Sequence, residues 1–207
     1  MTERNFLESA NLDRVEEALS VCLEQDRTLS LGVVLQLHKM LLEGVPEKPK
    51  RPLKPGRFRD ATDVVGAYGV EYLTAQMSPA WRIESDVIAL LEDVDRGELA
   101  SHAIHAAGRF HYRFARIHPF CDGNGRLARA LATFLVASEH PEVLNFEKPI
   151  NRIILEHRED YIGVLEYCDG IYEDLNEENI PEEAKLRKAP QPSSAWLPRQ
   201  SHPSSLP

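Results

Sequence analysis

The fold is decided by a short stretch that joins two helices, Ile117-His118-Pro119-Phe120-Cys121-Asp122-Gly123-Asn124-Gly125-Arg126-Leu127-Ala128-Arg129. Pro119 lacks a backbone N–H and disfavours the helical conformation at His118, so the preceding helix must end there. From Asn124 onward the apolar residues return every three or four positions, at Leu127, Leu131, Phe134 and Leu135. This spacing predicts a helix that begins inside the stretch and buries one apolar stripe.

The same stretch places phosphate-binding groups at the start of that second helix. A helix N-terminus offers unpaired N–H groups and the positive end of the helix dipole. The backbone around Gly123 and Gly125, together with the side chain of Asn124, can close on an anion there. Arg126 and Arg129 add planar guanidinium groups that fit phosphate oxygens. We therefore expect these five residues to bind phosphate.

Two further side chains of the stretch have the chemistry of catalysis. His118 has an ordinary pKa of about 6.5 and can act as a general base toward a hydroxyl at neutral pH. Asp122 offers a carboxylate to Mg²⁺, which binds one or two carboxylates together with phosphate oxygens and water. From the residues alone, the predicted chemistry is phosphoryl or nucleotidyl transfer.

Each feature also has an ordinary structural interpretation. A histidine before proline is usually a helix end, and Gly-Asn-Gly is usually a turn. Their combination at this spacing favours the functional interpretation. Phe120 is interpreted as an apolar anchor of the loop, and Cys121 as a neighbour of the site rather than a nucleophile. His102 and His105 are interpreted as packing or surface residues rather than metal ligands.

The stretch resembles, position by position, the signature of the Fic (filamentation induced by cAMP) domain family, His-x-Phe-x-Asp/Glu-Gly-Asn-Gly-Arg-x-x-Arg, and every fixed position is filled. The flanks are similar as well. Residues 35–42 resemble the family's upstream helix, 59–66 its flap, and 159–166 the helix after the motif. The resemblance spans roughly residues 30–170.

This resemblance implies an all-α, Fic-type helical bundle with one small β-hairpin flap. It implies a protein adenylyltransferase that transfers AMP from ATP to a Ser, Thr or Tyr hydroxyl of a target protein and releases pyrophosphate. In that reaction His118 is the base, and Asp122 holds Mg²⁺. Other members transfer UMP, phosphate or phosphocholine, or remove AMP, and a partner-binding protein with a relic site is a further alternative. The intact Gly-Asn-Gly-Arg argues against phosphate transfer, and the unbroken motif argues against a relic.

Two further sites follow from the resemblance alone. The flap is expected to bind the target protein by strand addition, at Asp63, Val64 and Val65. The adenine pocket is expected at Ile162, Leu165 and Asp169. Related proteins often carry Asn at the last of these positions. An ionised Asp accepts hydrogen bonds but donates none, so the preferred base stays open.

The resemblance also raises the question of inhibition. Many relatives are inhibited by a short helix of pattern Ser/Thr-x-x-x-Glu-Gly/Asn, whose Glu pairs with the last motif arginine. Two incomplete matches occur: Ser20 to Glu24, which lacks the final Gly or Asn, and residues 138–142, which contain a proline. We therefore expect Arg129 to be unmasked, and any inhibition to come from a separate partner or a longer precursor.

Composition narrows the class of protein. The 207-residue chain has a net charge of −9, opposite to that of a typical nucleic-acid-binding domain. It has no apolar run near the roughly 20 residues of a membrane helix and no signal peptide, so we expect a soluble, cytoplasmic protein with neither nucleic acid nor membrane as partner. Three widely spaced cysteines argue against a disulfide framework or a zinc site. The local excess of arginines around the motif favours a small anion such as ATP: Arg109, Arg113, Arg116, Arg126 and Arg129.

Helical patterns dominate the rest of the chain. Asn11 is the predicted N-cap of a first helix, and Thr28 or Ser30 that of a second, which ends near Gly44. Ser78 is the predicted cap of a third helix, whose apolar face is Ile83, Val87, Leu90 and Leu91. The pattern predicts further helices at residues 98–117 and 148–169. It predicts a loop at residues 48–59 and the hairpin at residues 63–72.

These patterns predict three regions. Residues 1–29 form an N-terminal helical extension, residues 30–175 the catalytic domain, and residues 176–207 a C-terminal tail. The tail is rich in proline and serine, so we expect disorder from about residue 184.

Overall fold

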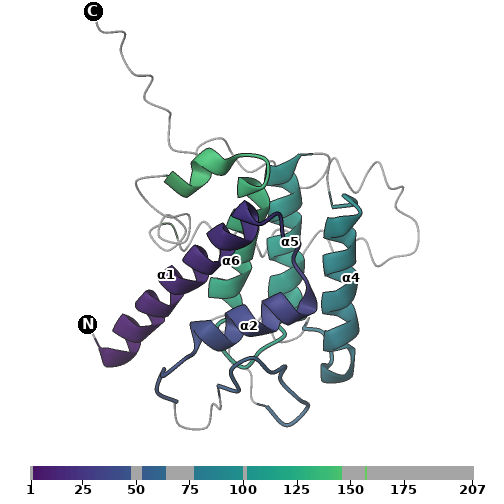
Figure 1. Cartoon of the computed structure of the whole chain (residues 1–207). Coiled ribbons are helices and arrows are strands. Elements are labelled where there is room, and N and C mark those ends of the chain that lie inside the picture. The colour runs from purple at the N-terminus through teal and green to yellow at the C-terminus, as the bar shows by residue number, and fades with distance from the viewer. Residues whose placement is uncertain (1, 48–52, 64–76, 100–101, 146–156, 158–207) are drawn as a thin grey trace, which may run out of the picture. The chain divides into compact units, whose positions relative to one another are not determined.

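The computed structural model describes residues 2–47, 53–63, 77–99, 102–145 and 157. Within these ranges there are helices but no strand, which confirms the all-α fold class (Figure 1). The α-helices and the 3₁₀ turns are α1 (Glu3–Glu24), α2 (Leu31–Leu41), η1 (Ala80–Arg82), α4 (Ile83–Asp95), α5 (Ala103–Ile117), α6 (Asn124–Ala137) and η2 (Pro141–Asn145). No helix in the described part of the chain combines the length and apolarity needed to cross a membrane.

The chain divides by its internal contacts into two units, residues 1–156 and 157–207, and every helix named above belongs to the first. The hairpin beyond Asp63, the helix predicted over 148–169 and the C-terminal tail lie outside the described residues. The described part of the predicted loop, residues 53–59, is non-helical as expected. The predicted domain boundaries at residues 29/30 and 175/176 stay predictions.

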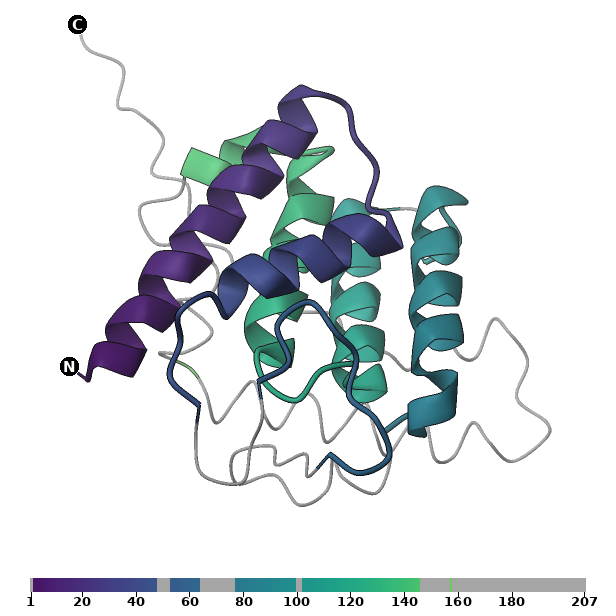
Figure 2. The same cartoon turned by 60° about the horizontal axis from the view of Figure 1, so that its bottom comes forward.

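Helices α5 and α6 form the centre of the described unit, where they lie side by side (Figures 1 and 2). Phe110 and Phe114 of α5 are fully buried, and so are Leu127 and Leu131 of α6. The apolar stripe predicted for α6 is therefore confirmed, since Phe134 and Leu135 are buried as well. This packing fixes the six-residue connection between the two helices, because both of its ends are anchored in the core.

Helices α1 and α2 cover the central pair, with α1 in contact with both α2 and α6 (Figure 2). Val15 and Leu19 of α1 are buried in the same core as Val34 and Leu37 of α2. Ser30 caps α2 as predicted, because its Oγ accepts a hydrogen bond from the N–H of Val33 (3.3 Å). The chain start is thereby packed against the helix that begins inside the motif.

The predicted cap of α1 is wrong. The helix begins at Glu3, with Thr2 as its cap, so Asn11 lies inside it and is buried. The Asn11 amide donates to the carbonyls of Leu41 (3.3 Å) and Glu43 (2.8 Å), at the end of α2. The last carbonyls of a helix lack partners within that helix. Asn11 therefore caps a neighbouring helix rather than its own, which only the tertiary fold reveals.

Two other helix starts also differ from the predictions. Ser78 does not cap α4, because its Oγ donates instead to the carboxylate of Asp86 (2.6 Å) and the chain makes the 3₁₀ turn η1 first. The predicted apolar face of α4, from Ile83 to Leu91, is buried as expected. Helix α5 begins at Ala103 rather than near residue 98, with His102 as its N-cap. Gly97, with a positive φ of 67°, lies just after the end of α4.

Candidate active site

His118 lies directly after α5 with a left-handed backbone, φ 48°. Its N–H donates to the carbonyl of Phe114 (3.1 Å), and its Nδ1 lies 3.3 Å from the carbonyl oxygen of Ala115. A carbonyl oxygen only accepts, so Nδ1 carries the proton and Nε2 keeps the free lone pair. Burial lowers the pKa of His118 to about 4. The ring is therefore neutral at pH 7, with Nε2 ready to accept a proton.

The loop after His118 is closed by the side chain of Asn124. Its Oδ1 accepts from the N–H of Phe120 (2.9 Å), and its Nδ2 donates to the carbonyl of Phe120 (2.8 Å). Phe120 itself is fully buried, which confirms its role as an apolar anchor. Both polar ends of Asn124 are thus used within the loop. Any phosphate contact of Asn124 would therefore use its backbone N–H rather than its side chain.

The start of α6 has the features of an anion site. Gly123 has a φ of 82°, and a Cβ there would lie 3.1 Å from Leu41, so both the backbone and the packing require glycine. The first turn of a helix leaves its N–H groups without partners in the helix. In α6 these belong to Asn124, Gly125 and Arg126. Their N–H groups and the helix dipole favour a bound phosphate at this point.

Arg129 lies over the same helix end. A Cβ on Gly125 would lie 3.1 Å from Nη1 of Arg129, so the absence of a side chain at Gly125 makes room for the guanidinium. Arg129 is buried. Burial, followed by the positive charge of Arg129, lowers the pKa of His111 to about 3. The last motif arginine is thus held beside the predicted phosphate donors.

Asp122 lies at the centre of a network of charged side chains. Its Oδ1 accepts from the N–H of Gly123 (2.7 Å) and from Nη2 of Arg126 (3.2 Å). Its Oδ2 accepts from Nη2 of Arg4 (2.6 Å), which comes from the first turn of α1. Glu8, one turn further along α1, pairs with Arg4 (2.8 Å) and lies 3.3 Å from Nη1 of Arg126. We call Arg4, Glu8, Asp122 and Arg126 the α1–motif ion network.

The contribution of α1 to this network was missed from the sequence. Arg4 and Glu8 lie more than 110 residues before Asp122, and the only local signal was their spacing of four on one helix face. Within the network, Nη1 of Arg126 is buried and makes no hydrogen bond in the described structure. Its ion-pair partner is the carboxylate of Glu8, 3.3 Å away, so a phosphate oxygen that binds Nη1 would have to compete with Glu8.

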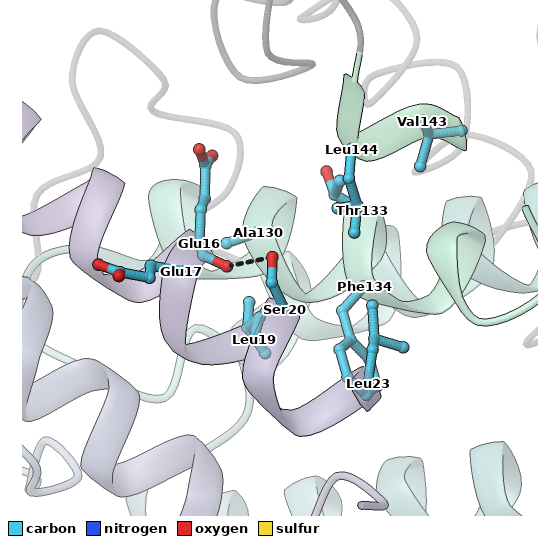
Figure 3. A pocket seen from close by; sticks show the side chains of 10 residues that line it. All are labelled: Glu16, Glu17, Leu19, Ser20, Leu23, Ala130, Thr133, Phe134, Val143 and Leu144. Atoms are coloured by element: carbon cyan, nitrogen blue, oxygen red, sulfur yellow. Dashed lines mark hydrogen bonds between the residues drawn. The ribbon is translucent and has the colours of Figure 1, made fainter. Parts of the chain in front are cut away.

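The incomplete inhibitory pattern at Ser20 to Glu24 lies away from the motif. Ser20 donates to the carbonyl of Glu16 (3.1 Å) and lines a cavity of about 180 Å³ against the later turns of α6, beside Thr133 and Phe134 (Figure 3). Glu24 is exposed and lies sixteen residues, hence about 24 Å of helix, beyond Glu8. In contrast to Glu24, Glu8 of α1 forms an ion pair with Arg126 of the motif.

His38 of α2 contacts the motif loop through its ring face and through a ring nitrogen. Its ring stacks on that of Phe120, with centroids 3.6 Å apart and planes 9° from parallel. Its Nδ1 accepts from the N–H of Gly56 (2.9 Å), so Nε2 carries the proton and donates to the carbonyl of Asp122 (3.0 Å). Burial lowers the pKa of His38 to about 4. One neutral imidazole therefore joins α2, the loop at Gly56 and the motif.

The buried histidines predict how stability depends on pH. In the folded protein the pKa values of His38 and His118 are about 4, against an ordinary 6.5. Between these values the unfolded chain binds more protons than the folded one, so stability is full above about pH 6.5 and falls as the pH drops toward 4. Urea unfolding at pH 7.5 and 5.0 measures this loss. We expect a smaller loss in His38→Gln than in wild type, and equal stability at both pH values in wild type would contradict the prediction.

The surroundings of Cys121 do not favour a nucleophilic thiolate. Burial and a hydrogen bond with Asp63 raise the pKa of its thiol to about 12, so the reactive thiolate is scarce at neutral pH. This confirms the interpretation from sequence. The carboxylate of Asp63 is directed into its own loop, where it accepts from Nζ of Lys54 (2.6 Å) and from the N–H of Asp60 (2.7 Å). Any contact of Asp63 with a target would therefore use its main chain.

The remaining predicted site residues lie outside the described part of the chain. They are Val64 and Val65 of the flap, and Ile162, Leu165 and Asp169 of the adenine pocket. The structure thus brings together His118, Asp122, the start of α6 and both motif arginines.

Comparison with known proteins identifies the family of the chain. The model of the Fic/DOC family matches residues 28–136, which include α2 and the whole motif. The chain belongs to the Fic/DOC family. A solved Fic family protein from Desulfovibrio desulfuricans superposes with a TM-score of 0.61 at 25% identity, over 82% of this chain and 47% of that one.

Several relatives carry the name protein adenylyltransferase. Protein adenylyltransferase fic-1 of Caenorhabditis briggsae is 25% identical over 194 residues, which cover 81% of this chain and 36% of the relative. Protein adenylyltransferase Fic of Nematostella vectensis is 27% identical over 155 residues, covering 70% of this chain and 33% of the relative. The chain thus spans about a third of the length of these Fic relatives.

Proposed function

We propose that this Fic protein is a protein adenylyltransferase, which transfers AMP from ATP to a Ser, Thr or Tyr hydroxyl of a target protein. The observation that carries the proposal is the convergence of a base and an anion site across one short loop. Nε2 of His118 has a free lone pair, and the first turn of α6 offers N–H groups next to the partly buried guanidinium of Arg126. The names of the relatives support AMP as the transferred group.

The reaction assigns a role to each group. The hydroxyl oxygen of the target bonds to the α-phosphorus of ATP, while the bond from that phosphorus to the α–β bridging oxygen breaks. The hydroxyl proton passes to Nε2 of His118, and pyrophosphate leaves with the electrons of the broken bond. The N–H groups at the start of α6 stabilise negative charge on the attacked phosphate. Arg126 and Arg129 bind the outer phosphates.

Asp122 fits the requirements of a Mg²⁺ site shared with a nucleotide. Mg²⁺ commonly takes one or two protein carboxylates and completes its shell with phosphate oxygens and water. Asp122 supplies one carboxylate, held in place by the N–H of Gly123 (2.7 Å). When bound, the ion would neutralise charge on the phosphates. Its binding requires that Oδ2 of Asp122 be released by Arg4.

The remaining assignments extend to residues beyond the described ones. We propose that ATP places its adenine at Ile162, Leu165 and Asp169, and that the target protein docks along Asp63, Val64 and Val65. We also propose the catalytic domain at residues 30–175 and a cytoplasmic location. UMP or phosphocholine transfer, AMP removal and a relic site are the alternatives, and the next experiment separates AMP transfer from UMP transfer.

The test of the proposed function is labelling with four nucleotides. The protein is incubated with cell lysate, Mg²⁺ and ATP, GTP, CTP or UTP labelled at the α-phosphate, and the products are separated on a gel. A labelled band with ATP alone is the expected result. Labelling with UTP in its place would identify UMP transfer. No labelled band and no self-labelling, for any of the four, would overturn the proposal and favour a relic.

The α1–motif ion network predicts that removal of Arg4 strengthens metal binding. Arg4 and Mg²⁺ compete for Oδ2 of Asp122. A partly exposed ion pair contributes up to about 1 kcal/mol, so Arg4→Ala should lower the Mg²⁺ concentration for half-maximal self-labelling by about 5-fold. The measurement is a Mg²⁺ titration of self-labelling at fixed ATP.

Glu24→Gly is the matched control for this prediction. It alters a glutamate at the far end of α1 and should leave the titration unchanged. A rise in activity with Glu24→Gly but not with Arg4→Ala would place inhibition at the Ser20–Glu24 pattern after all. An increased Mg²⁺ requirement in Arg4→Ala would mean that Arg4 assists the nucleotide site. If neither variant changes activity, control by a separate partner remains the proposal.

A further inference from the structure

Arg59 binds the main chain of the loop that carries the base. Its Nε donates to the carbonyl of His118 (2.7 Å), and its Nη2 donates to the carbonyl of Ser78 (2.5 Å) and, at 3.4 Å, to that of Ile117. Its own N–H donates to the carbonyl of Pro119 (2.9 Å). One residue therefore contacts three consecutive residues of the loop at the end of α5.

These contacts meet two physical needs of the loop. The last carbonyls of α5 have no partner within the helix, and Arg59 supplies donors for that of Ile117 and for the carbonyl that follows it. His118 has a left-handed backbone, which is unfavourable for a residue with a side chain and persists only where surrounding contacts hold it. The guanidinium suits this task, because its planar fork binds several acceptors at once.

The same guanidinium also joins the loop of the base to the residue before Pro79 and η1. Nε of Arg59 donates to the carbonyl of His118, and its Nη2 donates to that of Ser78. A shift of Ser78 would therefore be transmitted to the backbone of His118.

We propose that Arg59 is a positioning residue, which holds His118 in its left-handed conformation and connects the loop of the base to Ser78. The inference rests on the proposed function. Arg59 contacts neither the phosphate donors nor the ion network in the described structure, so its loss should slow the transfer step and leave ATP binding intact. Misplacement of a reacting group by about 1 Å can cost up to about 100-fold in rate.

The test compares Arg59→Ala and Arg59→Lys with Arg57→Ala, a change of an exposed arginine two positions away. In Arg59→Ala we expect the self-labelling rate at saturating ATP to fall roughly 10- to 100-fold, with ATP affinity within about 3-fold. Arg59→Lys keeps the charge but not the fork, so we expect an intermediate rate. Guanidinium ion at non-denaturing concentration should restore part of the activity of Arg59→Ala and none of the other variants.

A second measurement does not depend on transfer. Hydrogen–deuterium exchange of the full chain should increase over residues 114–120 in Arg59→Ala and stay unchanged in Arg57→Ala. Failure of the wild type to label anything would overturn the proposed function, while the exchange result would still test the positioning of the loop. A normal rate in Arg59→Ala, or a loss of ATP affinity equal to the loss of rate with exchange raised throughout, would overturn the inference.

Discussion

Replacement of His118 by alanine should lower AMP transfer by about 100-fold or more, while the affinity for ATP changes by no more than a few-fold. The reason is that Nε2 of His118 is the proposed proton acceptor, whereas the proposed phosphate contacts come from the start of α6 and its arginines. Self-labelling rates measure the first effect, and calorimetric titration of ATP measures the second.

His102→Ala is a suitable control for this variant, because His102 is an exposed histidine at the other end of α5. It should keep the wild-type rate and affinity. Near-normal transfer by His118→Ala would contradict the role of His118 as the base. A loss of ATP affinity as large as the loss of rate would instead show that His118 binds the nucleotide.

Replacement of Asp122 by alanine should abolish Mg²⁺-dependent transfer, because the metal would lose its proposed protein ligand. The expected result is no labelled product at any Mg²⁺ concentration that saturates the wild type. The measurement is a Mg²⁺ titration of self-labelling, with thermal unfolding to verify that the variant is folded. Asp122 has both oxygens engaged by neighbouring groups, so Asp122→Asn is the second variant, with a smaller change in shape.

Asp13→Asn provides the control for these variants, since Asp13 is an exposed carboxylate on α1. It should behave as the wild type. Wild-type transfer by Asp122→Ala at high Mg²⁺ would mean that the phosphates and water alone hold the metal. In that case Asp122 would act only as the partner of Arg4 and Arg126 in the ion network.

Where the structure around the motif is local in sequence, the sequence predicted it well. Pro119 ends one helix and the apolar stripe from Leu127 begins the next, so the chemistry between them is set within a few residues. The anchor Phe120 and the inert Cys121 were also interpreted correctly. Backbone preferences and helical periodicity act over short distances, which is why these features need no knowledge of the fold.

The errors concern side chains whose partners lie far along the chain. Asn11 was predicted to cap its own helix, but its amide binds carbonyls at the end of α2. Ser78 was predicted to cap α4, but binds Asp86. Both residues have side chains suited to capping and to other hydrogen bonds alike, so their local pattern cannot identify the partner.

The sequence by itself determined the family signature, the helical class and the residues that carry the proposed chemistry, because each depends on residue type at fixed local spacing. The tertiary structure alone decided what surrounds them. It brought Arg4 and Glu8 to the motif across more than 110 residues, and it placed Arg59 on the backbone of His118. Such contacts arise from the packing of α1 on α6 and of the loop at Arg59 on the end of α5, and packing between distant segments leaves no periodic signal in the chain.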